Sequence, residues 1–279
     1  MRITSNVLSI CMLAALPFTA QAGERCEHSA PRDSVLNLSG VKTVIFDIGP
    51  HVLSVTGGNT SSGSIRGKAC ASDAKRLAGL VVTQQRQGDK LIVRAERKGL
   101  FNKSDWLGKH YGYLTLAATL PDNLAVQVRL GSGNVVVNGV ATLSADVGSG
   151  DLEVRHVHGV FYADLGSGNI HASDIGGLHV VTVGSGDLSA RDVRGASWVG
   201  EIDSGEITIA DANGRVEIGS IGSGDARLSN IAGDVTVASI GSGDLQANGI
   251  DGDLVVDSLG SGSVGHRNVN GRVSIPKDD

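Results

Sequence analysis

The sequence contains few aromatic, proline and cysteine residues. Tryptophan, tyrosine and phenylalanine make up 3% of its 279 residues, and it has 5 prolines and 3 cysteines. A core of ordinary composition depends on large aromatic side chains, so aliphatic side chains must fill most of the buried volume here. So few cysteines exclude a disulfide-dense scaffold. The sequence also lacks an apolar run of the length that a transmembrane helix needs.

The N-terminus has the features of a secretory signal peptide. Arg2 precedes an apolar stretch over residues 7–18, and the small-x-small pattern that signal peptidase recognises ends at Ala22. We therefore expect residues 1–22 to be removed and the product to be exported, to the periplasm, the medium or the cell surface.

Export affects how the cysteines and the charge are interpreted. Cys11 lies in the leader, which leaves Cys26 and Cys70 in an oxidising compartment. A disulfide between them is the default expectation, and two separate buried thiols are the alternative.

The mature chain would keep 23 of the 24 basic and all 29 acidic residues, a net charge of −6. This excess of acidic residues argues against nucleic acid as a partner.

Eight similar turns recur in the second half of the chain. They begin at Gly131, Gly148, Gly166, Gly184, Asp203, Gly222, Gly241 and Gly260. The steps between them are 17, 18 and 18 residues and then 19 residues, and every turn except the fifth reads Gly-Ser-Gly. A fixed period of this size is typical of a solenoid, in which each repeat is one rung stacked on the previous one.

Aliphatic residues recur at fixed places in each rung. We number each rung from its first turn residue, which is position 0. Positions 4, 6, 9, 13 and 15 are mostly aliphatic and alternate with polar neighbours, which is the period of a strand rather than a helix. From Gly159 onward, glycine at position 11 indicates a second bend, where we expect a positive φ. The prediction is an all-β solenoid (β-helix) of about eight two-strand rungs over residues 131–279.

Residues 23–130 are predicted to be an irregular β-rich region that is continuous with the solenoid. Short apolar runs at 44–48 and 52–55 predict strands, and a hairpin is expected within 80–95. Ser72-Asp73 is placed to cap one short helical turn.

The order of these segments resembles a known family. VLSVTGG at 52–58 is followed by GDKLIV at 88–93, by LPDNLAV at 120–126, and then by serial Ser-Gly-Asp-Leu turns. This order is similar to the putative-adhesin family of exported β-helical proteins, which is related to the head domains called GIN. The resemblance covers most of the mature chain and implies the fold and export. The family offers no functional residues to transfer to this sequence.

Two patterns raise the question of a bound metal. Position 3 is occupied by Asp, Asn, Glu or Ser, and a stacked Asp column would suggest the calcium ladder of a β-roll. We interpret these side chains instead as closing the turns through backbone N–H groups, because Asn, Glu and Ser interrupt the column. No two solenoid histidines occupy the same position, so stacking does not assemble a zinc site. We expect neither a metal nor a cofactor.

No catalytic motif is present. The serine-rich turns contain no Gly-x-Ser-x-Gly elbow, and no lysine follows the glycines as in a phosphate-binding loop. A β-helix that acts on polysaccharides builds a cleft from long loops, and these rungs are too uniform to contain such loops.

The segment Lys98–Tyr113 is the first candidate binding surface. It places Phe101, Trp106 and Tyr111 among basic residues that include Lys109. Mixed aromatic and basic side chains suit a sugar, an anionic envelope polymer or a protein. The alternative is a loop held in place by its own aromatic residues.

Position 14 provides the second candidate. It is expected to bring Tyr162, Val180 and Trp198 to the outer surface of three successive rungs. Such an apolar patch is either a contact site or covered by another part of the chain, and the N-terminal region is the alternative cover.

Taken together, the patterns favour a non-enzymatic exported β-helical binding or surface protein. Its partner would be a glycan or a protein of the cell envelope or cell surface. The alternative is a periplasmic envelope-stress or assembly factor that binds a protein partner. A polysaccharide-acting enzyme is the third interpretation.

Overall fold

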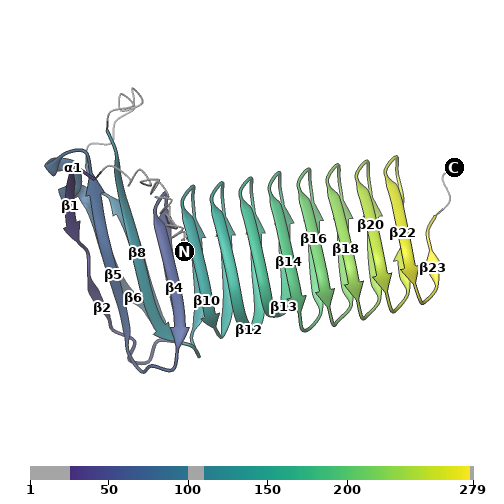
Figure 1. Cartoon of the computed structure of the whole chain (residues 1–279), viewed down its shortest axis with the longest axis horizontal. Coiled ribbons are helices and arrows are strands. Elements are labelled where there is room, and N and C mark those ends of the chain that lie inside the picture. The colour runs from purple at the N-terminus through teal and green to yellow at the C-terminus, as the bar shows by residue number, and fades with distance from the viewer. Residues whose placement is uncertain (1–25, 100–109, 277–279) are drawn as a thin grey trace, which may run out of the picture.

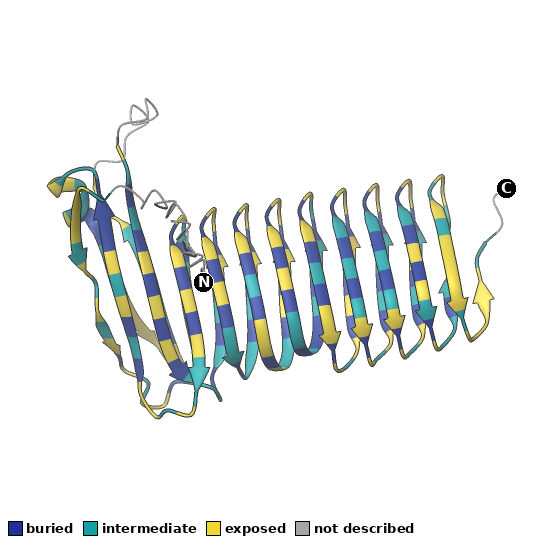
Figure 2. Cartoon of the chain, viewed as in Figure 1, coloured by how far each residue is buried: buried dark blue, intermediate teal, exposed yellow. Residues whose placement is uncertain are grey.

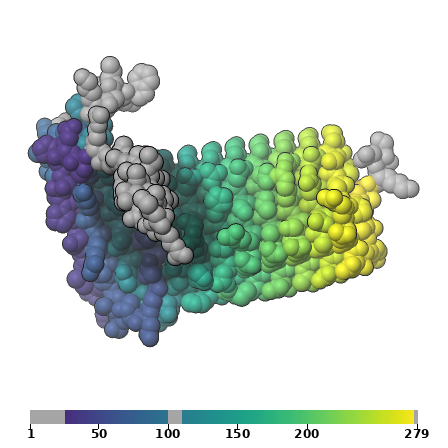
Figure 3. Space-filling view, in the orientation of Figure 1, coloured from purple at the N-terminus to yellow at the C-terminus, as the bar shows by residue number. Residues whose placement is uncertain are grey.

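The computed structural model describes residues 26–99 and 110–276, and in this part of the chain it forms an elongated β-solenoid (Figure 1). The predicted all-β fold is confirmed. The segment predicted to be a signal peptide and most of the segment 98–113 lie outside the described residues. In the space-filling view the rungs follow one another as regular ridges towards the C-terminal end (Figure 3).

Two parallel sheets form the two long faces of the solenoid. Face 1 contains the strand that follows each Gly-Ser-Gly turn: β10 (Asn134–Val140), the first halves of β12 (Asp151–Leu165) and β13 (Asn169–Val183), β14 (Asp187–Val193), β16 (Glu206–Ala212), β18 (Asp225–Ile231), β20 (Asp244–Ile250) and β22 (Ser263–Val269). Face 2 contains the returning strands: β9 (Ala125–Leu130), β11 (Thr142–Val147), the second halves of β12 and β13, β15 (Ser197–Ile202), β17 (Val216–Ile221), β19 (Val235–Ile240), β21 (Leu254–Val256) and β23 (Val273–Ser274).

The two rungs nearest the N-terminal end are not stacked in chain order. β3 (Thr43–Gly49) and β4 (Val52–Gly58) form one rung, and β7 (Lys90–Arg97) and β8 (Gly112–Pro121) form the other. β3 pairs with both β7 and β9, and β4 pairs with both β8 and β10, all parallel. The earlier rung in sequence therefore lies between the later rung and the serial repeats.

Antiparallel strands close the N-terminal end. They are β1 (His28–Pro31), β2 (Ser34–Leu36), β5 (Gly63–Ala71) and β6 (Leu80–Gln87). β5 pairs with β8, β1 and β2 pair with β5, and β6 pairs with β7. These pairings cover the N-terminal edges of the two parallel sheets, which would otherwise be open to another chain. We call this group of strands the cap.

Two local features next to the strands of the cap match the sequence predictions. The helix α1 (Ala74–Gly79) begins after Asp73, whose carboxylate accepts the backbone N–H of Arg76 at 2.8 Å. Cys26 and Cys70 form a disulfide, with their Cα atoms 5.4 Å apart. The bond joins the start of the described chain to β5.

The core is a set of aliphatic columns between the two faces. Partner residues such as Leu152, Ile170 and Leu188 are in register on successive rungs, and each is at most 1% exposed. Buried residues alternate with more exposed ones along inner strands such as β8 and β10, whereas the last strand of face 1, β22, is mostly exposed (Figure 2). Removing each such side chain from water stabilises the fold by roughly 1.5–3 kcal/mol, so the stacked columns supply most of the driving force.

The second bend differs from the prediction. The glycines at position 11 do not have a positive φ, and the left-handed residue is instead at position 8 in all eight rungs: Gly139, His156, Asp174, Asp192, Asp211, Asn230, Gly249 and Asn268. Asp and Asn tolerate this conformation better than most residues. Position 11 needs glycine because rungs approach closely there. A Cβ on Gly233 would lie 2.7 Å from the backbone nitrogen of Arg215.

Close stacking also explains the one irregular turn. At position 2, a Cβ on Gly205 would collide with the carbonyl oxygen of Gly186 on the preceding rung. Position 0 has more room, since a Cβ on Gly222 would lie 3.0 Å from the carbonyl oxygen of Asp203. Asp therefore replaces glycine at position 0 of the fifth turn, while position 2 is always glycine.

Candidate functional site

The position 3 column makes contacts between rungs. The Asn169 amide donates to Asp151 at 2.9 Å, and the Ser263 hydroxyl and backbone N–H both donate to Asp244, at 2.7 and 3.0 Å. These bonds join neighbouring rungs rather than closing each turn on itself, which corrects the sequence-based interpretation. Within residues 26–99 and 110–276, no group of three or more His, Cys, Asp and Glu side chains is arranged to hold a metal ion.

The segment 98–113 is described only at its two ends. Phe101, Trp106 and Lys109 lie outside the described residues, so their predicted binding role stays a prediction. Tyr111 is described. Its hydroxyl accepts the backbone N–H of Glu27 at 3.0 Å, and its carbonyl accepts the backbone N–H of Ser72 at 3.1 Å. Tyr111 therefore packs within the cap, where it holds the N-terminal segment.

The outward column on face 2 contains a histidine where valine was predicted. Tyr162 is in register with His179, and His179 with Trp198. Val180 is fully buried and faces the core. The prediction for Val180 was wrong because the register shifts by one residue between Val157 and Val160, and a one-residue shift reverses the side of every side chain that follows.

A bulge restores the register further along the same strand. Two residues of β13, Val181 and Thr182, stand where β12 has only Asp164. A bulge of this kind turns an extra side chain outward, and Val181 is 50% exposed. Both irregularities fall in the rungs that contain the aromatic residues.

The three rings form a stack, which we call the aromatic ladder: Tyr162, His179 and Trp198. The ring centroids of Tyr162 and His179 are 5.2 Å apart, and those of His179 and Trp198 are 4.3 Å apart, at interplanar angles of 41° and 32°. Ring pairs at these separations attract each other beyond simple burial. Tyr162 is still 45% exposed and Trp198 38% exposed, so the ladder and Val181 present apolar surface to solvent.

Glycine makes room for the indole at the end of the ladder. A Cβ on Gly200 would lie 2.9 Å from Cη2 of Trp198, so the indole lies over Gly200 on the same strand. On the next rung, Glu217 is in register with Trp198 and is paired with Arg215 at 2.7 Å. At the other end, Ser144 is in register with Tyr162. The aromatic surface is therefore bounded by polar side chains.

The two predicted surfaces belong to different parts of the molecule. Tyr111 immediately precedes β8, which extends face 1, whereas the aromatic ladder lies on face 2. The described residues therefore do not join the two surfaces into one site.

His51 is a buried polar residue that the sequence analysis did not identify. Its Nδ1 accepts the backbone N–H of Leu114 at 3.2 Å, so the neutral ring carries its proton on Nε2. Nε2 is buried and has no hydrogen-bond partner among the described residues. Burial, with the nearby charge of Arg97, lowers the pKa of His51 to about 4. The ring is enclosed and is not placed to bind a ligand.

The sequence matches no family model and no curated protein. Solved structures do match the fold. A putative adhesin from Parabacteroides merdae ATCC 43184 is 13% identical, with 86% of this chain and 97% of that chain covered and a TM-score of 0.50. A putative adhesin from Parabacteroides distasonis ATCC 8503 is 16% identical, with the same coverage and a TM-score of 0.47. At 13% identity, the likeness to the Parabacteroides merdae protein shows the fold alone.

Over the described ranges, no helix has the length and apolar character needed to cross a bilayer.

Proposed function

We propose that this chain is an exported, non-enzymatic β-solenoid that binds a glycan or protein of the cell envelope or cell surface. The aromatic ladder is the contact surface, and its exposure is the observation on which the proposal rests. Regular stacking dictates most of the surface of a solenoid, so a local departure that exposes aromatic rings calls for another explanation. The description of the Parabacteroides merdae protein as a putative adhesin is in keeping with such a role.

The disulfide supports export. Bonds such as Cys26–Cys70 persist in oxidising compartments and are rare in the cytosol. The alternative role, a periplasmic assembly or envelope-stress factor that binds a protein partner, uses the same surface but a different location. Fractionation of cells into periplasm, outer membrane and medium separates the two. An adhesin reaches the outside of the cell, and a periplasmic factor stays within.

The binding role is tested by Trp198→Ala and Tyr162→Ala. Aromatic residues dominate the energetics of contact surfaces. Each change should therefore lower the affinity for isolated cell envelopes, measured by co-sedimentation, at least about tenfold. The matched control is Thr236→Ala, at the same position two rungs beyond Trp198, and it should leave binding unchanged. Protease or periodate treatment of the envelopes then shows whether the partner is protein or glycan.

Stability distinguishes binding from internal packing. If the ladder serves only to hold the fold together, both changes lower the melting temperature, and their effects are non-additive because the rings belong to one stack. Loss of stability with envelope binding retained would contradict the proposal. Loss of binding with an almost unchanged melting temperature supports it.

A further inference from the structure

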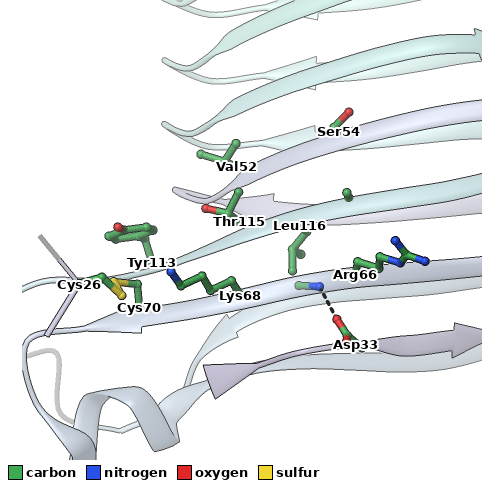
Figure 4. Close-up of a pocket in the computed structure, with 12 residues that line it drawn as sticks. Cys26, Asp33, Val52, Ser54, Arg66, Lys68, Cys70, Tyr113, Thr115 and Leu116 are labelled. Carbon is green, nitrogen blue, oxygen red and sulfur yellow. Dashed lines mark hydrogen bonds between the residues drawn. A yellow bond between two sulfur atoms is a disulfide. The ribbon is translucent and has the colours of Figure 1, made fainter. Parts of the chain in front are cut away.

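An open groove lies on the outer surface of face 1, where the parallel rungs meet the cap (Figure 4). Its volume is about 600 Å³, within the range of sites that hold small molecules. The groove runs over β4, β8 and β5, and the Cys26–Cys70 disulfide lies at one end. It is remote from the aromatic ladder, which lies on face 2.

The floor of the groove is largely apolar. Val52 on β4 is 41% exposed, although it is a large aliphatic residue. Ala117 and Leu116 on β8 and the ring of Tyr113 also line the groove. Water in contact with this surface is released when an apolar ligand covers it, which favours binding. The floor therefore suits an alkyl chain.

Two cations border this floor. Arg66 and Lys68 are two residues apart on β5, so their side chains point to the same side of the sheet. Both are exposed, and neither side chain has an ion pair or hydrogen bond in the part of the chain that the structure describes. In Figure 4, Lys68 extends towards Tyr113 and the disulfide, and Arg66 extends the opposite way.

Among the residues that line the groove, Asp33 alone has a carboxylate that could neutralise these cations. That carboxylate already accepts the backbone N–H of Gly67 at 2.9 Å. The groove is therefore locally positive on a chain whose net charge is −5. Local positive charge beside an apolar floor is complementary to a ligand that has an anionic head and an apolar chain.

We propose that this groove binds a single-chain anionic amphiphile. Its carboxylate or phosphate head pairs with Lys68 or Arg66, and its alkyl chain covers Val52 and Ala117. Charge gives the groove its preference for anions, and the apolar floor gives its preference for a chain over a small ion. The site is independent of the ladder and of the function proposed for it.

The test is calorimetric titration of the mature protein, disulfide intact, with dodecanoate or dodecyl phosphate below their micellar concentrations. One molecule of either should bind per chain, and the tighter of the two identifies the head group. Acetate, which lacks the chain, should give no measurable binding. Dodecyl maltoside, which has the same chain and a neutral head, should bind about tenfold more weakly than the anions.

Variants locate the site on the groove. Arg66→Gln or Lys68→Gln should weaken dodecanoate binding about fivefold, as expected for one exposed charge pair, and Val52→Ser should also weaken it. Arg129→Gln removes an exposed cation from face 2 and is the matched control. Trp198→Ala should leave dodecanoate binding unchanged, so that failure of the groove and failure of the ladder are told apart. All these positions are at the surface, and melting temperatures confirm that the variants fold.

Several outcomes would overturn the proposal. Absence of saturable binding would contradict it. Binding of many molecules per chain, unaffected by the Arg66 and Lys68 variants, would also contradict it, because that result indicates nonspecific adsorption of surfactant. Equal affinity for dodecyl maltoside would show that the cations are not used. Equal affinity for acetate would show that the apolar floor is not used.

Discussion

Single residues control how each rung bends. Position 8 has a positive φ in each of the eight rungs from Gly131 onward, and six of these rungs place Asp, Asn or His there rather than glycine. A left-handed conformation costs an ordinary L-residue roughly 1–2 kcal/mol, and Asp and Asn reduce this cost because their short polar side chains bond locally. The bend therefore depends on the choice of residue at one position.

Asp192 tests this conclusion, since its φ is 55°. Asp192→Gly should be neutral or slightly stabilising, because glycine adopts positive φ freely. Asp192→Val should lower the free energy of unfolding by roughly 1–2 kcal/mol, because a β-branched residue is strained there. Urea denaturation of the two variants measures both effects. Equal effects would show that conformation at position 8 does not matter.

His51 makes stability depend on pH. Its pKa is about 4 in the folded protein and close to its ordinary value of 6.5 when unfolded. The unfolded state therefore binds the proton more tightly, and stability falls as pH drops from 6.5 towards 4. The full difference amounts to roughly 3 kcal/mol.

The measurement is urea denaturation at pH 7 and pH 4. His51→Asn removes the titrating ring and keeps an acceptor for the N–H of Leu114. The native chain should lose roughly 3 kcal/mol more stability than this variant between the two pH values. Parallel losses would assign the pH dependence to other groups.

At the scale of elements, the two strands of a rung differ in how well the sequence predicts them. Positions 4, 6 and 9 follow the Gly-Ser-Gly turn directly, so their burial is predicted correctly, as for Leu152 and Val157. The second strand follows a bend of variable length, and position 14 is therefore Tyr162 in one rung and the buried Val180 in the next. A count from the preceding turn fails after a one-residue shift.

Pairings between distant segments were beyond prediction. The sequence indicates strands at 44–48 and 52–55. It does not indicate that the rung they form lies between the rung of β7 and β8 and the strands β9 and β10. The groove depends on such a pairing, because Arg66 lies near Ala117 only when β5 is antiparallel to β8. Local sequence patterns predict single strands and do not predict which distant strands pair with each other.

Burial by position predicts the effect of charge in β18. Ile231 is 1% exposed and Ser229, two residues earlier on the same strand, is partly exposed on the outer surface. Ile231→Asp should be severely destabilising, by more than about 4 kcal/mol, because it places a charge between aliphatic rungs. Ser229→Asp should change stability by less than about 0.5 kcal/mol. Thermal melts compare them directly, and similar effects would contradict the register.

At the scale of the whole molecule, contacts are confined to neighbours. Each repeat pairs only with the rung before it and the rung after it, as for β16 with β14 and β18. Stability in such a chain is approximately a sum of terms for single rungs and adjacent interfaces. Damage at one end is therefore expected to spread only part of the way along the solenoid.

The disulfide provides a test at this scale. Cys26 and Cys70 are separated by 44 residues, and closing a loop of this size stabilises the folded state by roughly 4 kcal/mol in the chain-entropy model. The double variant Cys26→Ser, Cys70→Ser should exchange backbone amide hydrogens faster in β1, β2 and β5. Protection in β16, β18 and β20 should not change, because those strands pair with neighbouring rungs and not with the strands of the cap. Faster exchange throughout would instead mean that cap and rungs unfold as one cooperative unit, and that the cap stabilises the whole solenoid rather than its own end.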